Sequence, residues 1–218
     1  MYDFHIHSSY SDGSMSVMKI AKRAKERGLK TIAIVDHSTE HRFGLTERKA
    51  LQRQREIEEA MDRYDIEILN GIECGIGAEG EISLPAFKFD IIIASIHDLV
   101  YGEEYYRRVE LCLKNCEFDI LGHFQSTIFS MNNGWREDKD MEIIDLLLEN
   151  DVAVELNSYH ACPTTEFLLR ASSRKLRYSF GSDAHTADRI GDIGWCIKAA
   201  GYLRRGRFVL EKMHNING

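Results

Sequence analysis

Proline and paired cysteine are scarce in this sequence. Only 2 of its 218 residues are proline, and its 5 cysteines are an odd number without a CxxC pair. The cysteines are Cys74, Cys112, Cys116, Cys162 and Cys196. Such a set indicates neither a disulfide framework nor a thiolate zinc site, so a reducing compartment fits best.

Long hydrophobic runs are also missing. The longest apolar run, around Ile91 to Ile96, is far below the roughly 18 residues that a membrane span needs. Asp3 and His5 stand near the N-terminus, where a signal peptide would be basic and then apolar. We therefore expect a cytoplasmic protein that does not bind membranes.

Positive charge is in deficit. Lys and Arg total 28 against 35 Asp and Glu, which gives a formal net charge of −7. A long nucleic acid would meet net repulsion at long range, whereas small ligands remain open. The stretch Arg204–Arg207 has no interleaved aromatic series, so we interpret it as a solvated turn and not as a nucleic-acid patch.

Apolar runs of strand length alternate with amphipathic stretches along the whole chain. Seven runs are expected as strands: Tyr2–His7, Thr31–Asp36, Ile66–Ile72, Asp90–Ile96, Phe118–His123, Val152–Asn157 and Arg177–Gly181. Helices are expected between the first two runs and over residues 47–63, 103–116, 138–150, 164–175 and 188–202. The charged residues of 47–63 are interpreted as a mostly solvated face.

This alternation predicts an α/β fold with a parallel sheet, because strands buried on both faces need covering helices. Seven such units closing on themselves would form a barrel, and an open doubly wound sheet is the rival architecture. The stretch HSSYSDGS after the first strand contains no Gly-rich phosphate-binding motif, so a nucleotide cofactor has no support. No linker is visible, and we expect a single domain over residues 1–218.

Polar residues of metal-ligand type end or follow six of the seven expected strands. They are His5 and His7, Asp36 and His37, Glu73, His97, His123, and Asp183 with His185. In a parallel barrel the C-terminal strand ends meet at one mouth, where barrel active sites lie. These side chains are therefore expected to converge.

A metal centre explains this coincidence better than separate structural roles do. A lone strand-end histidine is more often a core imidazole bonded to a backbone carbonyl, but six strand ends share the pattern. Glu73 and Asp183 follow apolar strands, and carboxylates in such places need cations nearby. No Lys or Arg occupies the other strand ends, so metal ions are the expected source of that charge.

The ordered motifs resemble those of the PHP (polymerase and histidinol phosphatase) family. They are His5-Ile6-His7, Ser11-Asp12-Gly13, Val35-Asp36-His37, Gly71-Ile72-Glu73, Ser95-Ile96-His97, Gly122-His123 and Gly181-Ser182-Asp183-Ala184-His185. The resemblance covers residues 1 to about 195. It implies a distorted, TIM-barrel-like (β/α)7 barrel with two or three divalent metal ions at its mouth.

The resemblance also implies three ligand sets. One metal would be held by His5, His7, Glu73 and Asp183. A second would be held by the bridging Glu73 with His97 and His123, and a third by Asp12, His37 and His185. Imidazole-rich ligation suits zinc, iron or manganese, and some family members have histidine where this chain has Asp12, which shifts the preference toward manganese or iron.

Phosphate ester hydrolysis follows from such a set. Paired metals about 3.5–4 Å apart lower the pKa of a shared water and hold the resulting hydroxide for in-line attack on phosphorus. Glu73, Asp183 and His185 are the expected catalytic residues. Candidates for substrate contact are Arg189 as first choice, Arg42, Arg136 and His160, each of which can also be read as an ordinary surface residue.

Several functions remain open at this stage. A small phosphate monoester is the favoured substrate, with histidinol phosphate the leading guess from the resemblance. A nucleotide or oligonucleotide phosphoesterase, including an exonuclease, is the main alternative. An amidohydrolase is disfavoured because Glu73 and the terminal DxH do not match that family, and a non-catalytic metal-binding module is disfavoured because no ligand position is lost.

Overall fold

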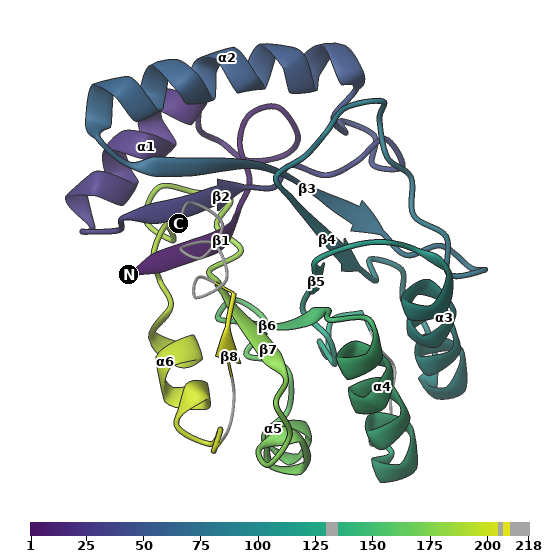
Figure 1. Ribbon diagram of the computed structural model, residues 1–218. Coiled ribbons are helices and arrows are strands. Elements are labelled where there is room, and N and C mark those ends of the chain that lie inside the picture. The colour runs from purple at the N-terminus through teal and green to yellow at the C-terminus, as the bar shows by residue number, and fades with distance from the viewer. Residues whose placement is uncertain (130–134, 205–206, 210–218) are drawn as a thin grey trace. The chain divides into compact units, whose positions relative to one another are not determined.

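Strands and helices alternate through the chain in the computed structural model, which describes residues 1–129, 135–204 and 207–209 (Figure 1). The strands are β1 (Tyr2–Ile6), β2 (Thr31–Ile34), β3 (Glu67–Gly75), β4 (Ile91–Ser95), β5 (Ile120–Leu121), β6 (Ala153–Asn157), β7 (Arg177–Gly181) and β8 (Arg207–Phe208). The helices are α1 (Val17–Glu26), α2 (Glu47–Tyr64), α3 (Gly102–Asn115), α4 (Glu137–Glu149), α5 (Thr165–Ala171) and α6 (Gly194–Ala200). The predicted α/β class and all seven predicted strands are confirmed.

Two details differ from the prediction. β8 pairs in parallel with β7 through Tyr178 and Phe208. It begins at Arg207, the last residue of the stretch Arg204–Arg207 that was interpreted as a solvated turn, and Arg205 and Gly206 of that stretch lie outside the described residues. Two residues are too few to give a periodic signal. The helix predicted from residue 188 begins only at Gly194, because short turns precede it and Gly191 has a φ of +73°, which ends helical geometry.

The chain forms two compact units. Unit 1 comprises Met1–Gly75, Ser83–Ile93 and Phe180–Ile193, and unit 2 comprises Ile76–Ile82, Ala94–Ser179 and Gly194–Gly218. Among the described helices, none combines the length and the hydropathy of a membrane span.

Unit 1 is built on parallel strands in sequence order. β1 pairs with β2 and β2 with β3, each in parallel. In Figure 1, α1 and α2 lie together on one side of these strands. Their apolar stripes, which include Ile20 of α1 and Ile57 of α2, pack with Ile6 and Ile34 in one core cluster. α1 ends where Gly28 takes a φ of +72°, as the predicted helix terminus requires.

The residues that directly follow β7, Ala184 among them, also belong to unit 1. Ala184 forms a parallel bridge with Ile6: the His7 N–H donates to the Ala184 carbonyl (2.9 Å), and the Ala184 N–H donates to the His5 carbonyl (3.2 Å). Because Ala184 is paired with the end of β1, its neighbours on both sides are placed beside the residues that follow β1.

Unit 2 repeats the alternation with shorter strands. β5 pairs in parallel with β6, with Ile120 opposite Ala153 and Leu121 opposite Val154. Helices α3 to α6 belong to this unit, and buried aromatic residues such as Tyr105, Phe124 and Phe167 form much of its core.

Candidate metal centre

The two histidines of the HxH motif lie side by side at the end of β1. Alternate residues of an extended strand point to the same side, and the Nε2 atoms of His5 and His7 are 3.0 Å apart. Both side chains are fully buried. The two side chains thus point to the same side of the strand, as their spacing predicts.

Two buried carboxylates face this pair. The Oε2 atom of Glu73, on β3, lies 3.4 Å from His5 Nε2, 3.5 Å from His7 Nε2 and 3.1 Å from His37 Nδ1. Asp183 Oδ1 lies 3.7 Å and 3.6 Å from the same His5 and His7 nitrogens. Three imidazoles therefore surround one oxygen of Glu73.

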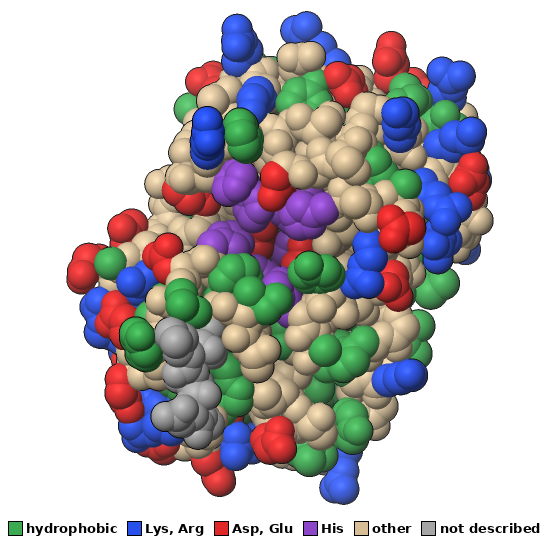
Figure 2. All heavy atoms as spheres, turned by 180° about the vertical axis from the view of Figure 1, so that it is seen from behind, with side chains coloured by type: hydrophobic (Ala, Val, Ile, Leu, Met, Phe, Trp, Pro, Cys, Tyr) green, Lys and Arg blue, Asp and Glu red, His purple; other side chains and the backbone are tan. Residues whose placement is uncertain are grey.

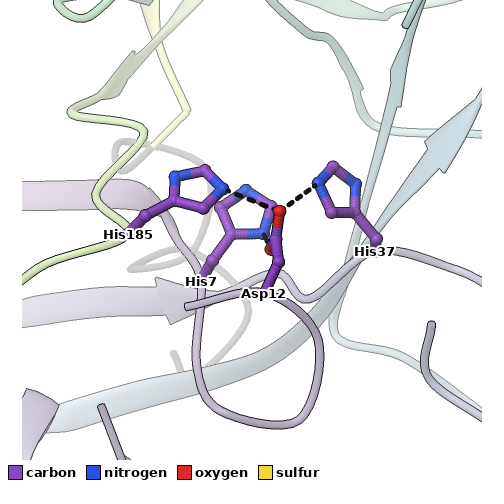
Figure 3. A group of neighbouring side chains, drawn as sticks. All are labelled: His7, Asp12, His37 and His185. Carbon is purple, nitrogen blue, oxygen red and sulfur yellow. Dashed lines mark ion pairs between the residues drawn. The ribbon is translucent and has the colours of Figure 1, made fainter. Parts of the chain in front are cut away.

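Asp12 gathers a second group at the edge of the first (Figure 3). Its carboxylate lies 3.5 Å from His37 Nε2, 3.3 Å from His185 Nε2 and 3.6 Å from His7 Nδ1. The turn that carries Asp12 requires Gly13, because a Cβ at that position would meet the His7 carbonyl oxygen at 2.2 Å. The glycine of the Ser11-Asp12-Gly13 motif is thus a geometric requirement of this turn.

Part of this group is open to solvent. The side chain of Asp12 is 30% exposed and that of His185 is 37% exposed. Figure 2 shows histidine side chains gathered with acidic side chains at the surface of the protein. A ligand from solution can therefore reach the Asp12 side of the group, while His5 and His7 remain enclosed.

Burial and neighbouring charges set the protonation of these groups. Burial lowers the pKa of His7 well below its usual range, and the nearby His37 lowers it further. Burial also opposes protonation of His37, but Glu73 and Asp12 raise its pKa above the usual value. Burial opposes protonation of His185 in the same way, but Asp12 and Asp183 together raise the pKa of His185 above the usual value. The carboxylates thus favour positive charge here.

The donor set fits divalent cations. Two groups of side chains each bring their ligand atoms within 4.8 Å of one another in unit 1: His7, Asp12, His37 and His185, and His5, His7 and Asp183. His7 Nδ1 is buried and makes no hydrogen bond within the described residues. Imidazole nitrogens with carboxylate oxygens are ligands that zinc, manganese and iron accept.

The remaining predicted histidines come together within unit 2. The rings of His97 and His123 are 5.3 Å apart, and those of His123 and His160 are 4.8 Å apart. The His123 N–H donates to Glu155 Oε2 (2.7 Å), and the His160 N–H donates to Asn157 Oδ1 (2.9 Å). These backbone contacts fix the loops after β5 and β6.

The three candidate arginines differ in their partners. Arg42 is exposed, with its guanidinium 5.2 Å from the centre of the Phe43 ring. Arg189 is half-buried and pairs with Asp192 (3.0 Å). Arg136, in unit 2, pairs with Glu103 and Asp138.

Two buried supports of the site were missed in the sequence. Arg53 is fully buried and pairs with Asp36 (2.6 Å), although the charges of its helix were expected to be solvated. The signal was its spacing, since α2 buries Ala50, Arg53, Ile57 and Ala60 on one stripe.

The other missed support is Asp3. It is fully buried and accepts hydrogen bonds from the Ser182 N–H (2.9 Å), the Ser182 hydroxyl (2.6 Å) and the Gly191 N–H (2.9 Å). It precedes His5 by two residues, so it belongs to the same side of β1. A carboxylate at that position of a buried strand was the available signal.

Comparison with known proteins bears on this centre. A family model described as the PHP domain matches residues 3–159. The DNA polymerase/3'-5' exonuclease PolX of Bacillus subtilis is 30% identical over 208 residues, which covers 91% of this chain but only 36% of the relative. A protein named as a probable phosphatase in Caldanaerobacter subterraneus is 28% identical over 222 residues, covering 90% of this chain and 80% of the relative.

A solved structure shares the fold. It is the histidinol phosphate phosphatase of Lactococcus lactis, described as a complex with zinc, L-histidinol and phosphate, with a TM-score of 0.67 and 21% identity. The alignment covers 88% of this chain and 93% of that one. The likeness confirms the predicted α/β, TIM-barrel-like fold class. The prediction of a single domain over residues 1–218 stays a prediction.

Proposed function

This chain belongs to the PHP domain family and is a metal-dependent phosphoesterase, and from that premise we propose that it hydrolyses a small phosphate monoester. One observation supports the proposal above the others: seven imidazoles and carboxylates, distant in the sequence, lie together in unit 1. They are His5, His7, Asp12, His37, Glu73, Asp183 and His185. The proposal includes the prediction that residues 1–218 form a single domain.

In this proposal two ligand sets share unit 1. His5, His7, Glu73 and Asp183 hold one divalent cation. A second is held by Asp12, His37 and His185. For His97 and His123 of unit 2 the proposed role is also that of metal ligands.

The bound cations would supply Lewis-acid activation of water and of phosphate oxygens. The chain's own residues then have separate tasks. Glu73 and Asp183 provide buried negative charge that favours cations, and the pKa values of His37 and His185, which Glu73 and Asp183 respectively help to raise, reflect that preference. Arg189 is the first candidate to bind the phosphate, since it lies four residues after His185 in unit 1. Arg42, Arg136 and His160 are the further candidates for substrate contact.

A small substrate agrees with the charge of the chain. The formal net charge of −7 disfavours a long polyanion, whereas two or three divalent cations make their own surroundings attractive to a phosphate dianion. Histidinol phosphate is the first compound to test, because the similar Lactococcus lactis enzyme was solved with L-histidinol and phosphate.

A nucleotide or oligonucleotide phosphoesterase is the second candidate. Its support is the 30% identity to PolX, a protein named as a 3'-5' exonuclease, over 91% of this chain. The chain spans 36% of that relative's length, so the remainder of PolX has no counterpart in this alignment.

The test compares phosphate release from a panel of esters by the protein loaded with Mn²⁺ and by the chelated protein. The panel contains histidinol phosphate, p-nitrophenyl phosphate, a nucleoside monophosphate, bis-p-nitrophenyl phosphate and a single-stranded oligonucleotide. Metal-dependent release from monoesters alone supports the proposal, and cleavage of the diester and oligonucleotide favours the second candidate.

A matched pair of variants ties the activity to the site. Asp183→Asn removes a buried charge at the centre, and Asp62→Asn makes the same change at an exposed position of α2. We expect Asp183→Asn to abolish turnover and Asp62→Asn to retain it. Near-normal turnover in Asp183→Asn would reject the proposed site.

A further inference from the structure

Helix α2 presents a row of charged side chains to the loops that carry the candidate ligands. Lys49, Arg53 and Glu56 follow one another at helical spacing. Lys49 and Glu56 contact the turn after β1, and Arg53 contacts the end of β2 and the middle of β3. We propose that Arg53 is a positioning residue that fixes Asp12 and His37 in place through Asp36. This inference rests on the proposed metal site.

Arg53 is a fully buried arginine whose donors point at Asp36, which follows β2, and at the middle of β3. Its Nη1 atom is 2.6 Å from Asp36 Oδ2, and its Nε–H donates to Asn70 Oδ1 (2.8 Å). The remaining nitrogen donates to the Gly71 carbonyl. One planar guanidinium thereby joins α2, the end of β2 and the middle of β3.

Asp36 passes this constraint to the turn that contains Asp12. Its Oδ1 atom accepts from the Ser8 N–H (2.8 Å) and the Ser11 hydroxyl (2.7 Å). Its Oδ2 atom accepts from the Ser8 hydroxyl (2.7 Å) as well as from Arg53. Ser11 directly precedes Asp12, and Asp36 directly precedes His37, so one buried carboxylate fixes the backbone beside two candidate ligands.

The neighbouring charges of α2 act on the same loops. Lys49 Nζ donates to the carbonyls of Tyr10 (2.9 Å), Phe43 (2.8 Å) and Gly44 (3.1 Å), and the Tyr10 hydroxyl donates to Glu56 Oε1 (2.7 Å). These contacts are partly exposed, whereas the Arg53–Asp36 pair is fully buried. Arg53 is therefore the member of the row whose loss most affects the turn.

A buried pair of this kind cannot lose one partner at low cost. Without Arg53, Asp36 would be a buried carboxylate without a cation, and water would have to enter the turn to solvate it. That water would compete with the hydrogen bonds that Asp36 accepts from Ser8 and Ser11. Residues that orient metal ligands in this indirect way typically change metal affinity by about 10–100-fold.

The experiment measures Mn²⁺ binding to the full chain by calorimetric titration, well below the unfolding temperature. Arg53→Met keeps the length of the side chain and removes the charge. Arg55→Met is the matched control, since Arg55 lies two residues further along α2 and is exposed. We expect affinity to fall about 10–100-fold in Arg53→Met and to remain unchanged in Arg55→Met.

Two further measurements separate positioning from a merely structural role. Hydrogen exchange of residues 8–13 in the metal-free protein is expected to speed up in Arg53→Met, beyond the change in global stability. Arg53→Lys restores the charge without the planar fork, so it is expected to recover part of the affinity. A structural role alone would lower the unfolding temperature and leave the Mn²⁺ affinity intact.

If Arg53→Met does not fold, a milder variant tests the positioning role instead. Ser11→Ala removes one hydrogen bond to Asp36 at a partly exposed position, and it is expected to weaken Mn²⁺ binding several-fold. Wild-type affinity in a folded Arg53→Met, or in Ser11→Ala where Arg53→Met is unfolded, would overturn the inference while the proposed function stands. A wild-type protein that binds no Mn²⁺ would overturn both.

Discussion

The substitution Glu73→Gln tests the centre of the proposed site most directly. It preserves the shape of a side chain that is 1% exposed and removes its charge, leaving an amide among the nitrogens of His5, His7 and His37. A single positive charge about 4 Å from the carboxylate attracts it by about 4 kcal/mol at an effective dielectric constant of about 20, and Mn²⁺ carries two such charges. Because about 1.4 kcal/mol corresponds to a factor of ten, loss of this attraction raises the Mn²⁺ dissociation constant by at least about 10³-fold.

The assay is Mn²⁺ titration against a competing fluorescent chelator, together with release of phosphate from p-nitrophenyl phosphate at saturating Mn²⁺. Glu59→Gln, at an exposed position of α2, is the matched control and is expected to behave as wild type. Circular dichroism establishes that both variants are folded. If Glu73→Gln bound Mn²⁺ within about threefold of wild type and kept its turnover, the electrostatic reasoning would be wrong.

Three other predictions concern stability and metal removal. Burial opposes the ionisation of Asp36, but Arg53 holds the pKa of that carboxyl below its usual value, so its stabilisation is present above about pH 4 and is lost as pH falls through the folded-state pKa. In urea titrations of the metal-free protein, the difference in unfolding free energy between wild type and Asp36→Asn should therefore narrow as the pH falls from about 5 to about 3, which is about one unit on either side of the usual carboxyl pKa. A difference that stays constant over this range would contradict the prediction. Chelation should abolish phosphate release and re-addition of Mn²⁺, Zn²⁺ or Fe²⁺ should restore it selectively, whereas equal activity in thoroughly demetallated protein would refute metal dependence. Ile57→Ala should cost about 2–5 kcal/mol of unfolding free energy and Leu51→Ala, at an exposed position of the same helix, less than about 0.5 kcal/mol; similar values would show that α2 is not packed through Ile57.

The ligand-type residues at the strand ends were predictable from two sequence patterns. His5 and His7 stand two residues apart, which places both on one side of β1 whatever the rest of the chain does. Glu73 and Asp183 follow apolar runs, where an unpaired carboxylate is too costly to be accidental. The gathering of these four residues therefore follows from sequence spacing and the rules of parallel sheets.

The supports behind the ligands were harder to predict. Arg53 belongs to a helix rich in both charges, and although its spacing places it on the buried stripe of α2, its partner Asp36 is fixed only by the tertiary fold. The partners of Asp3 are Ser182 and Gly191, more than 170 residues away along the chain, so no local pattern could identify them. Contacts of this range are fixed by the fold as a whole.

The bridge between Ile6 and Ala184 also determines when the centre can be completed during synthesis. A ribosome releases the HxH motif well before Asp183 and His185, which leave the exit tunnel only after all of Ala94–Ser179 has been made. Until then Asp3 lacks the hydroxyl and amides that satisfy it in the finished protein. Cation capture by the full ligand set therefore has to wait until that segment has been made, and a nascent chain interrupted before Ser182 cannot acquire it.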